Sequence, residues 1–183
     1  MYEVEVKVAA DHERVRAELA KHDATPVDHV RQRDTYYDAP DRDFAETDEA
    51  LRIRRETDEE SGETTTRLTY KGPLVDDESK TRRELETGVE NGETMDGVLR
   101  ALGYDPAAVV DKERERFRVD GYTVTLDSVT DVGAFVEVER EVPESELDAA
   151  REGAFEVLRS LGLDPDDGIR TSYLGMLLES RAE

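Results

Sequence analysis

The stretch YEVEVKV, Tyr2 to Val8, alternates strictly between apolar and charged residues. Side chains of an extended strand point to opposite faces in turn, so the apolar residues share one face and Glu3, Glu5 and Lys7 share the other. For one strand alone, a charged face in water is the simplest interpretation, because antiparallel sheets commonly leave one face solvated. The rest of the chain decides whether this charged face has another purpose.

Length and composition predict one domain over residues 1–183 with room for a sizeable core. The absence of cysteine excludes disulfides, thiol nucleophiles and thiolate metal sites. The chain begins directly with a strand pattern, and no apolar run approaches the ~20 residues of a membrane span. We therefore expect a cytoplasmic protein that is not embedded in a membrane.

The charge is strongly acidic, with 47 Asp and Glu against 25 Lys and Arg, a formal net charge of −22. Such a field repels nucleic acid and anionic membranes, so we expect neither as a partner. One hypothesis is halophilic adaptation to molar salt, where the screening length shortens to about 3 Å. The alternative is an acidic protein of ordinary cytoplasm. Loss of folding in dilute buffer would favour the halophilic hypothesis, and a normal melt there would count against it.

The alternation of the first strand recurs along the chain. It is found in ALRIRRE (50–56), RLTYKG (67–72), KTRRELE (80–86), KERERFRV (112–119), YTVTLDSV (122–129) and AFVEVEREV (134–142), with a further strand expected in VRQRDTYYD (30–38). Helical spacing predicts helices after an Asp11 cap, after a Thr94 cap, from Pro143 to Gly162, and around residues 173–178. These elements predict an α+β fold built on an antiparallel sheet.

Two arrangements of that sheet remain open from periodicity. An open sheet would leave its charged face in water, whereas a sheet closed on itself would turn that face inward as a polar tunnel under outer helices. In a tunnel, Arg and Lys would hold phosphate oxygens, namely Arg52, Arg54, Lys71, Arg82, Lys112 and Arg114. Carboxylates would suit Mg²⁺ or Mn²⁺, namely Glu3, Glu5, Asp127, Glu137 and Glu139. The matching ligand is a polyanion carrying a divalent metal, such as a triphosphate.

Other chemistries are not supported by the sequence. It contains no GxxxxGK[ST] phosphate loop and no GxSxG nucleophile elbow. Glu84 and Glu86 could form an acid/base pair, but charge pairing with neighbouring strands is the simpler role.

Several stretches resemble a known family in the family's own order. ExExK at Glu3 to Lys7 is similar to the N-terminal signature of the CYTH superfamily, the triphosphate tunnel metalloenzymes. Further matches are DTYYDAP (34–40), RDFAETDEALRIR (42–54), LTYKGP (68–73), KTRRELE from Lys80, KERERF from Lys112, TLDSV around Asp127 and GAFVEVE from Gly133. The motifs RDFA–TDEALRIR and LTYKGP resemble those of the class IV adenylyl cyclase, or CyaB-type, branch of the superfamily. The resemblance covers nearly the whole chain.

The resemblance implies an eight-stranded antiparallel β-barrel with helices outside, a single CYTH domain over residues 1–183, and Mg²⁺ or Mn²⁺ as cofactor. It implies Glu5 and Glu137 as principal metal ligands, with Glu3, Asp127 and Glu139 as additional carboxylates. Asp127 could instead orient a lysine or arginine. The implied catalytic set is Glu5, Lys71, Lys112, Asp127 and Glu137. The implied phosphate-binding set is Lys7, Arg52, Arg54, Lys71, Arg82, Lys112 and Arg114.

The resemblance also implies a reaction, and it leaves two alternative functions open. The leading expectation is a class IV adenylate cyclase that converts ATP to 3′,5′-cyclic AMP and pyrophosphate. The alternatives are a tripolyphosphatase or thiamine triphosphatase, and a non-catalytic binder of nucleotides or polyphosphate. Retention of all the carboxylates argues against the pure binder, since an anion binder would gain from losing negative charge. The resemblance to the family is the only basis for expecting a homodimer.

Overall fold

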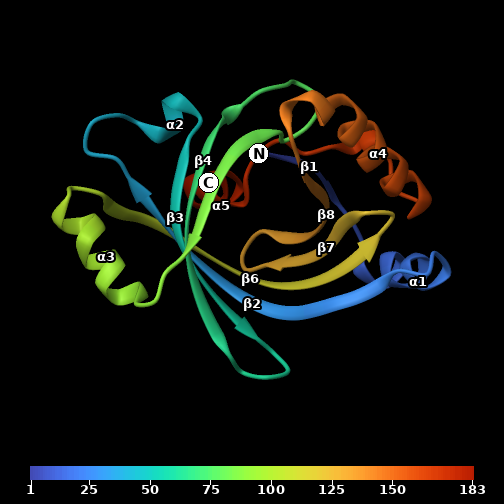
Figure 1. The fold of residues 1–183 in the computed structure, drawn as a ribbon, viewed down its shortest axis with the longest axis horizontal. Helices are drawn as coiled ribbons and strands as arrows, with labels where there is room; N and C mark the ends of the chain where they lie inside the picture. Colours follow the sequence, from blue (N-terminus) through green and yellow to red (C-terminus); the bar gives the residue numbers. More distant parts are fainter.

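Eight β-strands form a closed antiparallel barrel in the computed structural model, which describes residues 1–183 (Figure 1). The barrel order is β1-β5-β4-β3-β2-β6-β7-β8, and β1 is paired along its whole length with residues 135–142 of β8, which closes the ring. The strands are β1 (Tyr2–Ala9), β2 (Thr25–Asp38), β3 (Ala50–Asp58), β4 (Thr64–Leu74), β5 (Arg82–Gly88), β6 (Asp105–Val119), β7 (Tyr122–Val129) and β8 (Gly133–Val142). The sheet is therefore the closed one of the two arrangements that periodicity allowed.

Five α-helices and two 3-10 helices accompany the barrel. They are α1 (His12–Lys21), α2 (Phe44–Thr47), α3 (Gly92–Ala101), η1 (Glu144–Glu146), α4 (Leu147–Ser160), η2 (Pro165–Asp167) and α5 (Tyr173–Ala182). In Figure 1, α1 and α4 lie on one side of the barrel, and α2 and α3 lie on the opposite side. None of these helices has the length and apolar character needed to cross a membrane.

The apolar residues of the alternating strands face outward and are covered by helices. The largest core cluster joins the outer faces of β1, β7 and β8, through residues such as Val6, Val124 and Val138, to α1 and α4. Val15 and Leu19 supply the buried side of α1, and the Asp11 side chain caps this helix by accepting from the Arg14 amide. Burial of these valines leaves the charged residues of the same strands to face the lumen.

α5 occupies a different place from the outer helices. Val110, Val129 and Phe135 alternate in phase with the charged lumen residues of their strands, yet they pack against Tyr173 and Leu177 of α5. Figure 1 shows α5 behind the strands and within the outline of the barrel. The lumen is therefore apolar at this end, where α5 covers it.

Several element boundaries differ from the sequence expectations. β2 and β6 begin five and seven residues before the expected stretches at Val30 and Lys112, and α2 was not predicted. The residue that caps α3 is Asn91, whose side chain accepts from the Thr94 amide at 2.9 Å, so the prediction of Thr94 as the cap was wrong. β5 begins at Arg82, which leaves Lys80 in the preceding loop.

A close approach of α4 to β7 gives a test of the packing. A Cβ added at Gly153 would overlap the hydroxyl of Tyr122, which donates to the Ala150 carbonyl at 3.0 Å. We expect Gly153→Ala to destabilise the fold by about 1–3 kcal/mol, as overpacking does. Gly97→Ala is the matched control, because nothing lies within 4 Å of its added Cβ in α3. The control should stabilise by roughly 0.5–1 kcal/mol through helix propensity. Equal unfolding free energies for both variants in a denaturant titration would contradict this packing.

Candidate active site

The barrel lumen is a cavity of about 970 Å³ lined mainly by charged and polar side chains. Register pairs place charged residues of neighbouring strands side by side on the inner face of the barrel, as with Lys7 and Glu137 on β1 and β8 and with Arg114 and Asp127 on β6 and β7. Ten of the twelve site residues expected from the sequence line this cavity, and they are Glu3, Glu5, Arg52, Arg54, Lys71, Arg82, Lys112, Arg114, Glu137 and Glu139. Residues far apart in the chain are thereby brought to one tunnel.

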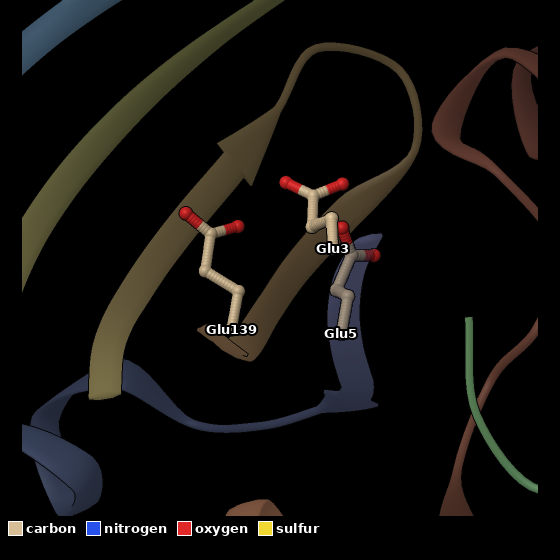
Figure 2. Close-up of side chains that lie close together, drawn as sticks. All are labelled: Glu3, Glu5 and Glu139. Carbon is tan, nitrogen blue, oxygen red and sulfur yellow. The ribbon is translucent and has the colours of Figure 1, made fainter. Parts of the chain in front are cut away.

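Three of the expected carboxylates form a cluster. Glu3 and Glu5 of β1 and Glu139 of β8 each offer an oxygen, and these oxygens all lie within 4.8 Å of one another. Figure 2 shows the three carboxyl groups side by side and pointing to the same side of the strands. Burial and the charges of Glu3, Glu137 and Glu5 raise the pKa of Glu139 to about 8. Crowded oxygen ligands of this kind fit a hard divalent cation, which would relieve their mutual repulsion.

Glu137 lies outside this three-carboxylate cluster. Its Oε2 accepts from Arg114 Nη2 at 2.7 Å, and burial together with the charge of Glu5 raises its pKa. The structure thus places Glu5 in a cluster with Glu3 and Glu139, and Glu137 lines the same cavity close enough for the charge of Glu5 to raise its pKa. Glu5 and Glu137 as principal metal ligands stay a prediction.

Lys80 is a lumen residue that the sequence reasoning did not assign to the site. Its Nζ donates to Glu5 Oε1 at 2.6 Å, and its backbone amide donates to the Glu5 carbonyl at 2.8 Å. Burial alone would raise the pKa of Glu5, but Lys80, Lys71 and Lys7 outweigh burial and hold that pKa well below its usual range. The alternation of KTRRELE places Lys80 on the same face as Arg82 and Glu84, but its pairing with Glu5 could not be read from that pattern, because Lys80 lies in a loop.

Asp127 is fully buried, and both of its oxygens are engaged. Arg114 donates to it through Nε at 2.7 Å and Nη2 at 2.6 Å, and the hydroxyl of Tyr173 donates to Oδ2 at 2.7 Å. This fork geometry fixes the guanidinium in one orientation. Of the two roles left open by the sequence, the geometry favours orienting an arginine over binding a metal.

Lys7 is also held behind the cavity wall. Its Nζ donates to the Thr171 carbonyl at 2.5 Å and lies 4.2 Å from the centre of the Tyr173 ring. Only 1% of the residue is exposed. Lys7 therefore contacts the segment that leads into α5, and Tyr173 is a second residue missed from the sequence, since its helical spacing pointed only to packing.

The remaining expected cations are paired differently. Lys71 Nζ lies 2.8 Å from Glu3 and 2.7 Å from Glu84, so it links β4 to the carboxylates of β1 and β5. Arg82 donates mainly to backbone, with Nη1 at 2.9 Å from the Gly72 carbonyl. Arg52, Arg54 and Lys112 all meet Asp34, a buried carboxylate of β2 that the sequence reasoning also left unassigned.

The fold and the lumen define a class of protein, the closed β-barrel tunnel with cations and carboxylates on its inner wall. The CYTH domain profile matches residues 1–173, and the chain belongs to the CYTH domain family. A protein of Methanocaldococcus jannaschii, named as a candidate adenylate cyclase, is 38% identical over 176 residues, which make up 95% of this chain and 97% of that protein.

Solved structures agree on the fold. A protein from Pyrococcus horikoshii OT3 is 37% identical, with a TM-score of 0.90 over 98% of this chain and 99% of that chain. A more distant structure from Hippeastrum, described as a candidate adenylyl cyclase with a dominant triphosphatase activity, is 16% identical. Its TM-score is 0.65 over 97% of this chain and 95% of that one, and at this identity the likeness shows the fold alone. The family and the eight-stranded barrel expected from the sequence are both confirmed.

Proposed function

We propose that the tunnel binds the triphosphate of ATP and that the protein is a metal-dependent adenylate cyclase. The observation that carries this proposal is the presence, in one cavity, of a three-carboxylate cluster and several buried cations. A triphosphate with a divalent metal complements both parts, because cations bind its oxygens and carboxylates bind the metal. The name of the M. jannaschii relative supports the cyclase over other uses of the same tunnel.

The carboxylates Glu3, Glu5 and Glu139 would hold the divalent ion that the proposed reaction needs, Mg²⁺ or Mn²⁺. When bound, such an ion supplies Lewis-acid stabilisation of charge on phosphate oxygens. The residues of the chain supply orientation and further positive charge. Arg54 and Arg114 are each fixed by a buried aspartate, so their remaining donors point in set directions without reorganisation during the reaction.

In the cyclase reaction the 3′-oxygen of the ribose forms a bond to the α-phosphorus, and the bond between that phosphorus and the bridging oxygen breaks to release pyrophosphate. In-line attack requires the ribose to be held next to the α-phosphate, so the protein's task is mainly positioning and charge stabilisation. Lys71, Lys112 and Arg52 line the cavity and would bind phosphate oxygens as negative charge shifts toward the leaving group.

A triphosphatase is the second candidate function. The same contacts to the phosphates would also position a triphosphate for attack by water on the terminal phosphorus. The Hippeastrum protein with this fold is described as having a dominant triphosphatase activity. The two reactions differ in the nucleophile and in the phosphorus attacked, while the charged lumen would act in the same way in both.

Product analysis tests the proposal. Purified protein would be incubated in molar KCl with Mg²⁺ or Mn²⁺ and, separately, with ATP, inorganic tripolyphosphate or thiamine triphosphate, and the products resolved by anion exchange. Cyclic AMP with equimolar pyrophosphate is the expected result. Orthophosphate without cyclic AMP would establish the triphosphatase, and tight binding without turnover would establish a binder. Glu113→Gln, at an exposed outer position, is the matched control for lumen variants.

A further inference from the structure

Asp34 on β2 is a carboxylate with no exposed surface that contacts side chains from both neighbouring strands. Arg54 of β3 donates to it through Nε and Nη2, both at 2.7 Å. On Oδ2 it also accepts from Lys112 Nζ of β6 at 3.1 Å and from Arg52 Nη1 of β3 at 3.5 Å. One buried carboxylate thus joins three cations that line the cavity.

The balance of charge around Asp34 favours an incoming anion. One carboxylate is in hydrogen-bond contact with three cations, whereas Arg114, two residues along β6 from Lys112, contacts two carboxylates, Asp127 and Glu137. The Nε of Arg52 is also buried without a hydrogen-bond partner. A buried donor without a partner is costly, so a ligand oxygen that reached it would gain a full hydrogen bond.

We propose that Asp34 is a positioning residue, which aligns Arg54, Arg52 and Lys112 as one basic wall for the phosphates of the substrate. The identity of that substrate rests on the proposed function, whereas the alignment by Asp34 does not. Asp34 acts through these three side chains and is not expected to touch the substrate itself, because its own oxygens are occupied by them.

The ionisation of Lys112 gives this role a measurable signature. Burial lowers the pKa of Lys112 to about 7, Arg54 and Arg114 add to the lowering, and Asp34 and Asp127 oppose it. The ring of Tyr173 from α5 lies 5.4 Å from Nζ. Because the negative charge of Asp34 favours the protonated amine, removing that charge should lower the pKa of Lys112 further and leave Lys112 less often protonated at neutral pH. The substitution also removes one negative charge, so weaker anion binding would come from lost alignment and lost Lys112 protonation and not from a lower net positive charge.

The first experiment follows the lysines directly by NMR. The chain has five lysines, Lys7, Lys21, Lys71, Lys80 and Lys112, so ¹³Cε-labelled lysine gives five resonances, and Lys112→Met assigns the relevant one. In Asp34→Asn we expect the Lys112 midpoint to fall by about one pH unit or more, which is a tenfold change in proton affinity. Asp34→Glu should restore much of the difference. Asp111→Asn is the matched control, because Asp111 pairs with Arg33 between the same two strands on the outer face.

The second experiment measures binding of inorganic tripolyphosphate by calorimetry, with chelator present to exclude metal. Asp34→Asn should bind more than about tenfold more weakly at pH 8, and the difference should shrink at pH 6, where Lys112 regains its proton. A role in folding alone would lower the melting temperature without moving the Lys112 midpoint or the pH dependence of binding, and that result would overturn the proposal.

If Asp34→Asn does not fold, Lys112→Met decides the matter. We expect the unchanged protein to show a step in tripolyphosphate affinity near pH 7, where Lys112 titrates, and Lys112→Met to lose it; a step that persists in this variant would overturn the proposal. Failure of the triphosphate-binding part of the proposed function is distinguishable, because the unchanged protein would then bind no tripolyphosphate at any pH, while the NMR titration would still report on Asp34 and Lys112. A triphosphatase in place of a cyclase would be seen in the product analysis and would leave these binding results unchanged.

Discussion

Glu5→Gln is expected to lower kcat/KM by about 10²-fold or more at saturating metal, as does the loss of a single charge-stabilising group in other enzymes. Glu5 belongs to the three-carboxylate cluster and also accepts from Lys80, so the amide removes a proposed metal ligand and leaves a buried ammonium without its counterion. Steady-state kinetics on ATP would measure the loss in rate. Calorimetric titration with Mn²⁺ would measure the expected loss of metal affinity.

Two further variants make this result specific. Glu113→Gln should keep activity within about twofold, because surface substitutions of this kind change little. Glu137→Gln should weaken Mn²⁺ binding less than Glu5→Gln does, because Glu137 is bonded to Arg114 and lies outside the cluster. Activity of Glu5→Gln within threefold of the unchanged protein would remove Glu5 from the proposed metal site.

Arg114→Met is expected to cost about 3–5 kcal/mol of unfolding free energy, the range for breaking a buried ion pair from one side. The substitution leaves Asp127 and Glu137 buried without the guanidinium that now bonds both of them. Arg33→Met is the control, since its pair with Asp111 is exposed on the outer face and should contribute less than about 1 kcal/mol. Denaturant titrations at high salt would compare the two, and a loss below 1 kcal/mol for Arg114→Met would contradict the buried network.

The cost of Arg114→Met should also depend on pH. Arg114 is the main group that offsets the effect of burial on Asp127, with Lys112 and the Tyr173 hydroxyl adding less. Without the arginine we expect burial to raise the pKa of Asp127 above its value in the unfolded chain, so that the folded state binds the proton more tightly than the unfolded state. Stability is then lost as pH rises through the raised pKa of the folded state. We therefore expect the difference between Arg114→Met and the unchanged protein to grow from acidic to neutral pH.

Much of the fold could be predicted from the alternation of apolar and charged residues. That pattern assigned Glu3 and Glu5 to one face of β1 and the valines to the other, and the structure places the valines under α1 and α4. Closure of the barrel could not be predicted from periodicity, because an open sheet has the same alternation. The predicted lengths of β2 and β6 were also too short. These strands begin at Thr25 and Asp105, and their first residues do not alternate between apolar and charged side chains.

The charge partners inside the lumen were harder to predict than its lining. Asp34 lies in phase with Tyr36 and Gln32 on the inner face of β2, so its orientation was predictable, but its three contacts depend on the register of β2 with β3 and β6. Lys80 reaches Glu5 from a loop, and Phe135 is an apolar residue in a charged row because α5 covers that end. Pairings of this kind depend on three-dimensional packing that a single sequence does not specify.

The pairing of β1 with β8 has a consequence for the order of assembly. Residues 2–9 pair with residues 135–142, so a nascent chain must expose nearly all of itself before its first strand finds this partner. Contacts of such long sequence separation form slowly. Glu3 and Glu5 meet Glu139 across this same seam, so the cluster comes into existence only when the ring closes. A cation bound there would link the first and last strands of the barrel. Because it would bind only the closed ring, a higher cation concentration would shift the folding equilibrium further toward that ring by mass action.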